Sequence, residues 1–67
     1  MAVARVTEIS STSATSFEDA IKSGLERANQ TLRNVRSAWI KEQQVRVESG
    51  SISEYQVNML VTFVLDD

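Results

Sequence analysis

The strongest constraint on the fold of this chain is the apolar or aromatic residue at every second position of residues 55–65. Every odd position carries an apolar or aromatic side chain, a period-two pattern typical of a strand with one buried face. The odd positions are Tyr55, Val57, Met59, Val61, Phe63 and Leu65, and the even positions are Gln56, Asn58, Leu60, Thr62 and Val64. The segment therefore predicts a strand whose odd face must be covered, while its even face is polar at one end and apolar at the other.

A single amphipathic helix can cover that odd face. Apolar residues recur at spacings of three and four from Phe17 to Val35, which predicts a helix over about residues 17–34. The stripe consists of Phe17, Ala20, Ile21, Gly24, Leu25, Ala28, Leu32 and Val35. Gly24, in the middle of this apolar stripe, lowers the stability of the helix by about 1 kcal/mol relative to alanine. A glycine at this point indicates that the helix approaches a strand closely.

The segment before the helix, from Ser10 to Ser16, is rich in hydroxyl side chains. It contains no glycine and no lysine follows it, which argues against a phosphate-binding loop. We expect a loop that ends in a helix cap, in which Ser16 accepts a hydrogen bond from the backbone N–H of Asp19. Glu18 and Asp19 would then lie in the first turn, where the helix dipole favours anions.

The remaining segments predict two more strands. Residues 2–9 are rich in β-branched types, and a second extended segment follows the helix up to a turn at residues 48–51. The order strand, helix, strand, strand predicts an α+β fold, with one helix packed on a three-stranded antiparallel sheet. We expect one domain over residues 1–67, because a chain of this length has no room for a second core.

The strand after the helix changes phase along its length. Ala38 and Ile40 share one parity, whereas Val45 and Val47 share the other. A strand keeps its apolar residues on one face across such a change only if an extra residue intervenes. We therefore expect a bulge or sharp bend at residues 42–44.

Association is the remaining way for this chain to gain stability. It has 67 residues, no cysteine and no histidine, which removes disulfides and most structural metal sites. A chain this short gains little net stability from its own core. One helix covers only one face of the sheet, so Trp39, Leu60 and Val64 are expected to stay exposed in a monomer. Because an exposed apolar face of this kind commonly marks an interface, we expect a homo-oligomer.

Composition disfavours several classes of function. Without cysteine or histidine there is no thiolate nucleophile and no side chain that ordinarily titrates near neutrality, so we expect no enzymatic activity. The net charge of −2 and the scattered basic residues disfavour nucleic acid. No apolar run approaches the roughly 20 residues of a membrane span, and the first residues lack a signal-peptide pattern. We expect a cytoplasmic protein.

Segments spread over nearly the whole chain form a combination typical of one family. They are Ser16-Phe17-Glu18-Asp19-Ala20, Thr31-Leu32-Arg33-Asn34, the Gly50 turn, Tyr55-Gln56-Val57 and Val61-Thr62-Phe63-Val64-Leu65. Together they resemble the dodecin family. The resemblance implies a hollow homododecamer with cubic-type symmetry, whose subunits each have a helix partly wrapped by a three-stranded antiparallel sheet. It also implies storage and quenching of a flavin, riboflavin or FMN, rather than turnover.

The same resemblance implies a set of binding residues. In flavin-binding members, tryptophans of neighbouring subunits enclose pairs of isoalloxazine rings, and a glutamine on the last strand holds the pyrimidine edge. Gln56 matches that glutamine, and its amide offers a donor beside an acceptor. An ungapped alignment, which we prefer, places Ser37 at the tryptophan and Gln44 at an arginine that often follows. A gapped alignment would instead place Trp39 and Arg46 at these two positions.

Two interpretations of these residues stay open. Trp39 shares the face of Ser37, about 6.5 Å further along the strand, and either stacks on a ligand or packs at an interface. Gln56 either holds a ligand or bonds a neighbouring subunit. The leading hypothesis is non-catalytic flavin binding and sequestration by a dodecin-like shell. The alternative is a shell without flavin that is structural or binds cations through oxygen ligands such as Glu42, Glu48 and Glu54.

Overall fold

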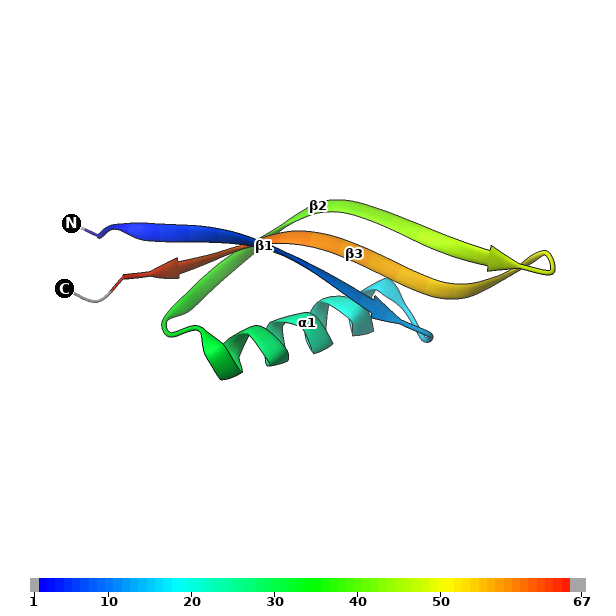
Figure 1. The fold of residues 1–67 in the computed structure, drawn as a ribbon, viewed down its shortest axis with the longest axis horizontal. Helices are drawn as coiled ribbons and strands as arrows, with labels where there is room; N and C mark the ends of the chain where they lie inside the picture. Colours follow the sequence, from blue (N-terminus) through cyan, green and yellow to red (C-terminus); the bar gives the residue numbers. More distant parts are fainter. Residues whose placement is uncertain (1, 66–67) are drawn as a thin grey trace.

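The computed structural model describes residues 2–65 as one three-stranded sheet with one helix across it (Figure 1). The sheet is antiparallel and has the order β1-β3-β2, so the strand with the strictest alternation lies in the centre. This is the predicted α+β arrangement. The elements are β1 (Ala4–Ser13), α1 (Phe17–Thr31), β2 (Val35–Glu48) and β3 (Ser51–Val64).

The core lies between α1 and the odd face of β3. Val57, Met59 and Val61 are fully buried there beneath Ala20 of the helix. A Cβ at Gly24 would lie 2.6 Å from the Cε atom of Met59, and it would also crowd β1. This confirms that the glycine marks a close approach of the helix to the sheet.

The first strand extends further than the sequence predicts. It runs to Ser13 rather than ending near residue 9, because Ser10 pairs with Asn58 and Ser13 pairs with Tyr55. The hydroxyl-rich segment was expected to be a loop, and that expectation is wrong for its first four residues. Serine favours turns through local hydrogen bonds, but here the backbone groups of β3 supply the partners instead.

Two serines join the end of β1 to the start of α1. The Ser16 hydroxyl accepts a hydrogen bond from the backbone N–H of Asp19 at 3.0 Å, which confirms the predicted cap. The Ser13 hydroxyl donates to the Asp19 carboxylate at 2.7 Å and accepts from the backbone N–H of Thr15 at 2.9 Å. The helix start is therefore tied to the strand that precedes it.

The helix ends at Thr31, three residues before the predicted end. The backbone turns to an extended conformation at Leu32, whose N–H still donates to the carbonyl of Ala28 at 2.8 Å. Asn34 then adopts φ 60°, a left-handed conformation that asparagine tolerates. Leu32 and Val35 pack against the core from non-helical backbone, which is why they extended the apolar stripe. Within residues 2–65, no helix is long and apolar enough to cross a membrane.

The phase change in β2 is present, but it lies earlier than predicted. The pairing register shifts between Ile40 and Glu42, so the extra residue is Lys41 rather than one at residues 42–44. The sequence alone locates the extra residue no more narrowly than between Ile40 and Val45, because the apolar residues change from even to odd positions within that interval. The exposed Lys41 side chain forms an ion pair with Glu8 at 3.3 Å, an interaction available only in the folded sheet.

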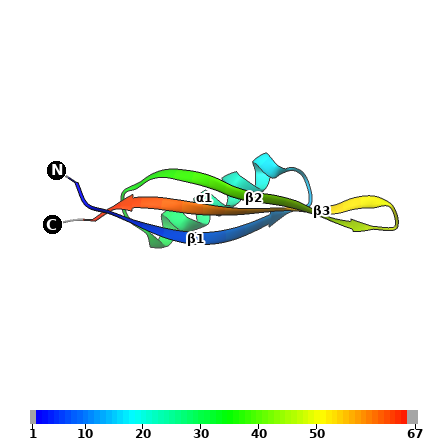
Figure 2. The ribbon, with the colours of Figure 1, turned by 90° about the horizontal axis from the view of Figure 1, so that it is seen from above.

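The β2–β3 hairpin projects beyond the N-terminal end of α1 (Figures 1 and 2). Its two-residue turn has φ 52° at Ser49 and φ 80° at Gly50, matching the turn predicted at residues 48–51. Val47 and Ile52 pair with each other near the tip and are exposed. The hairpin gives the chain its elongated shape of 51 × 19 × 13 Å.

Candidate functional site

The face of the sheet opposite α1, which we call the uncovered face, gathers all four residues singled out by the sequence. Residues paired across neighbouring strands point to the same side, and the odd residues of β3 point to the helix. Gln44 pairs with Gln56, Trp39 pairs with Leu60, and Ser37 pairs with Thr62. All of these side chains therefore lie on the side of the sheet away from the helix.

Hydrogen-bonded polar side chains cross the uncovered face from β2 to β1. Nε2 of Gln44 donates to Oε1 of Gln56 at 3.2 Å. Nε2 of Gln56 donates to the Ser10 hydroxyl at 3.1 Å and to Oδ1 of Asn58 at 3.2 Å. Nδ2 of Asn58 donates to Oε1 of Glu42 at 3.1 Å. We call these five residues, Ser10, Glu42, Gln44, Gln56 and Asn58, the amide ladder.

The amide ladder fixes the orientation of the Gln56 side chain. Both hydrogens of its Nε2 are directed to Ser10 and Asn58, whereas Oε1 accepts one bond and keeps a second lone pair. Nε2 of Gln44 makes one hydrogen bond among the described residues and has a second hydrogen. An acceptor on Gln56 therefore lies beside a donor on Gln44. Such a pair can bind a planar ligand edge that carries an N–H next to a carbonyl.

The other end of the uncovered face is apolar. Trp39 is 74% exposed, the largest exposed fraction among the large hydrophobic residues described. Its partner Leu60 and nearby Val64 are half-buried, and Val6 on β1 is exposed. The prediction that a monomer leaves Trp39 uncovered is confirmed, and Leu60 and Val64 are only partly covered.

The amide ladder and Trp39 are separated along the sheet. Trp39 pairs with Leu60, which is four residues from Gln56 along β3. Trp39 and Gln56 are therefore about 13 Å apart along the strand direction. The row of Ser37 is six residues away, or about 20 Å. One chain therefore brings Gln44 and Gln56 together but holds Ser37 and Trp39 apart from them.

The glutamates considered as cation ligands do not converge. Glu42 belongs to the amide ladder, Glu54 forms an ion pair with Arg46 at 3.8 Å, and Glu48 lies at the hairpin turn. Among residues 2–65 there is no group of three or more side chains that could hold a metal ion.

Sequence reasoning missed the participation of Ser10 and Asn58. Asn58 was recognisable as a polar residue on the same face as Gln56, because it is two positions away in a strand. Ser10 was assigned to a loop, and only its pairing opposite Asn58 places its hydroxyl within reach of Gln56.

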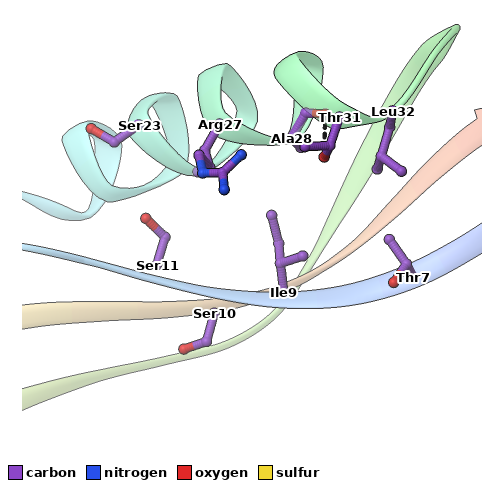
Figure 3. Close-up of a pocket in the computed structure, with 10 residues that line it drawn as sticks. Thr7, Ile9, Ser10, Ser11, Ser23, Arg27, Ala28, Thr31 and Leu32 are labelled. Atoms are coloured by element: carbon purple, nitrogen blue, oxygen red, sulfur yellow. Dashed lines mark hydrogen bonds between the residues drawn. The ribbon is translucent and has the colours of Figure 1, made fainter.

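Sequence reasoning also missed a groove of about 460 Å³ between β1 and α1 (Figure 3). Ile9 and Leu32 supply apolar surface in it, and Arg27 brings a positive charge from the helix. Ser10 points away from this groove, toward the uncovered face. The groove arises because small side chains on the edge strand β1 face small side chains on α1. No predicted site residue lines it.

Comparisons with known proteins agree on one family. The family model described as Dodecin matches residues 3–66. The solved structure of a dodecin from Streptomyces davaonensis has a TM-score of 0.94 and 38% identity, covering 98% of this chain and 97% of that one. A variant of the Thermus thermophilus dodecin also has a TM-score of 0.94, at 33% identity, covering 100% of this chain and 98% of that one.

A second kind of relative is named for a cation. The calcium dodecin of Mycobacterium tuberculosis is 33% identical over 63 residues, which are 94% of this chain and 89% of the relative. The solved structure of that protein has a TM-score of 0.82 and 34% identity, covering 96% of this chain and 91% of that one.

Proposed function

This chain belongs to the dodecin family, and from that premise we propose that it forms a symmetric homo-oligomer that binds and sequesters a flavin without changing it chemically. The observation that carries the proposal is the Gln44–Gln56 amide pair, held in one orientation on the uncovered face of the sheet. The assembly we propose is a dodecamer, as the family resemblance implies.

The shape of the single chain supports assembly. The fully buried side chains between α1 and β3 form a small core, while Trp39 stays exposed. Small chains without disulfides or metals commonly gain the missing stability by oligomerisation. The uncovered face and the projecting hairpin supply apolar surface for that purpose.

The amide pair supports a flavin as ligand. The pyrimidine part of the flavin ring presents an imide N–H flanked by carbonyl oxygens. The Gln56 Oε1 atom can accept from the N–H, and the free hydrogen on Nε2 of Gln44 can be donated to an adjacent carbonyl. Neither interaction requires a charged side chain.

The separation of Trp39 from Gln56 implies that a complete site uses more than one copy. Side chains about 13 Å apart along one sheet do not enclose a single ring. In an oligomer, Trp39 of one copy can stack over a ring whose edge is held by the amide pair of another. By analogy with base stacking, such a contact contributes about 1–3 kcal/mol.

Titration of the purified protein into riboflavin tests this function. We expect the fluorescence of the flavin to be quenched, because a stacked indole can donate an electron to the excited ring. Light scattering on the same sample should give a mass many times 7.5 kDa. Unchanged fluorescence of both riboflavin and FMN at high micromolar protein would refute flavin binding, and a concentration-independent monomer would refute the assembly.

A second candidate function is cation binding by the same shell, favoured by the similarity to the Mycobacterium tuberculosis calcium dodecin. The described carboxylates of one chain do not form a site, so one would have to combine carboxylates from several copies. Calorimetric titration with Ca²⁺ distinguishes this candidate. Saturable binding of Ca²⁺ together with unchanged flavin fluorescence would favour it over flavin sequestration.

A further inference from the structure

The uncovered face carries four carboxylates, those of Glu8, Glu42, Glu48 and Glu54, but only two cations in described ion pairs. Nζ of Lys41 lies 3.3 Å from the Glu8 carboxylate, so this cation is already paired with a carboxylate. Nη1 of Arg46 lies 3.8 Å from the Glu54 carboxylate. Among residues 2–65, Glu42 has no cation within ion-pair distance and instead accepts a hydrogen bond from Asn58. The charged groups of this face therefore leave an excess of negative charge beside the amide ladder.

The amide ladder itself offers hydrogen bonds but no positive charge. Protein sites that bind phosphate commonly use arginine or lysine, whose charged hydrogen bonds are stronger than neutral ones. Thr12 of β1 pairs with Gln56 from the other side, so Thr12, Gln56 and Gln44 form one row across the three strands. All three side chains are neutral. A further register shift between Val35 and Ser37 leaves Arg36 as an extra residue of β2, and within one chain it lies about 20 Å along the sheet from that row.

Assembly increases this negative field. One chain has a net charge of −2 at pH 7, and every copy in a homo-oligomer adds the same charge. A phosphate monoester carries about −1.5 to −2 charges at that pH. The summed potential of the assembly therefore opposes the approach and binding of a phosphorylated ligand, most strongly at low ionic strength.

We infer that the ladder selects an uncharged planar heterocycle by its N–H/carbonyl edge, and that the phosphorylated form of the same ring binds more weakly. The inference rests on the proposed flavin function and concerns the charge of the ligand. For flavins it predicts that riboflavin is preferred to FMN. The ring is common to both, so the hydrogen bonds and stacking are the same and only the phosphate distinguishes them.

The test compares the dissociation constants of riboflavin and FMN, measured by fluorescence quenching with the intact oligomer at about 20 mM and 500 mM salt. At low salt we expect riboflavin to bind roughly tenfold more tightly. At high salt the ratio should fall, because the Debye length shrinks to a few ångströms. Equal or tighter binding of FMN at low salt would overturn the inference and leave the flavin function intact. Absence of binding by both ligands would overturn the function and the inference with it.

Matched variants locate the source of the selectivity. Glu42→Gln keeps an oxygen acceptor for Asn58 while removing the negative charge of the ladder, and it should reduce the riboflavin-to-FMN preference several-fold at low salt. Glu48→Gln removes the same charge at the hairpin turn, four residues of β2 beyond Gln44, and should reduce the preference less. An equal effect of the two variants would assign the selectivity to net charge alone and contradict a role for Glu42. Gln44→Arg introduces a cation into the ladder and should reverse the preference toward FMN.

Discussion

Gln44 and Gln56 face each other across β2 and β3, and Nε2 of Gln44 donates to Oε1 of Gln56 over 3.2 Å. The two residues are twelve positions apart in the chain. They meet only because the β2–β3 hairpin pairs the two strands and the register shift between Arg46 and Val47 sets Gln44 opposite Gln56. Their amides act as one unit, so substitution of either should affect binding through the other.

Substitution of the two glutamines should weaken flavin binding unequally. Gln56→Ala removes the acceptor and leaves Gln44 without its partner, so we expect about tenfold weaker binding of riboflavin. Gln44→Ala should weaken binding by a smaller factor. Gln43→Ala is a matched control, because Gln43 pairs with Val57 on the opposite face of the sheet. Quenching titrations measure all three, and a loss with Gln43→Ala equal to that with Gln56→Ala would contradict the assignment.

Replacement of Trp39 separates stacking from interface packing. If the indole stacks on the flavin, Trp39→Ala should abolish quenching and weaken binding up to about a hundredfold, while the mass from light scattering stays the same. Trp39→Phe should restore part of the affinity. A variant that dissociates into smaller species would show instead that Trp39 is an interface residue.

Gly24→Ala should destabilise the protein although alanine is the better helix former. The added Cβ would lie 2.6 Å from Cε of buried Met59 and 3.0 Å from Cβ of Ser11. We expect a net loss of about 1–3 kcal/mol in the free energy of unfolding, despite a gain of up to about 1 kcal/mol in helix propensity. Denaturant unfolding at fixed protein concentration measures the loss. Ser23→Ala, at an exposed position of the same helix, should be neutral or slightly stabilising.

Ser49→Asn should stabilise the hairpin. Ser49 adopts φ 52° in a two-residue turn before Gly50, and asparagine accepts this left-handed conformation more readily than serine. We expect a gain of up to about 1 kcal/mol in thermal or denaturant unfolding. Ser51→Asn, which lies just after the turn in the first position of β3, should give no such gain. A loss of stability with Ser49→Asn would show that the turn has another requirement.

Local pattern in the sequence was sufficient to predict the order of elements and the buried faces of the helix and of the central strand. The alternation of residues 55–65 identified the central strand, and the spacing of apolar residues after Phe17 identified the helix. Ser16 and Gly24 were predicted correctly as the cap and as a point of close approach. These features depend on the repeat of a strand or a helix and on single residues with strong local preferences. They can therefore be predicted from residues that are close together in the sequence.

Only the tertiary structure decided where the elements end and which polar groups meet. Serine is tolerated both in loops and in strands, so pairing with β3 determined that Ser10 lies in a strand. Leu32 packs on the core equally well from extended backbone, so the apolar stripe did not reveal the end of the helix. The position of the Lys41 bulge and the amide ladder depend on the register between strands. Register is a relation between distant segments, and side-chain hydrogen bonds across the sheet exist only once it is set.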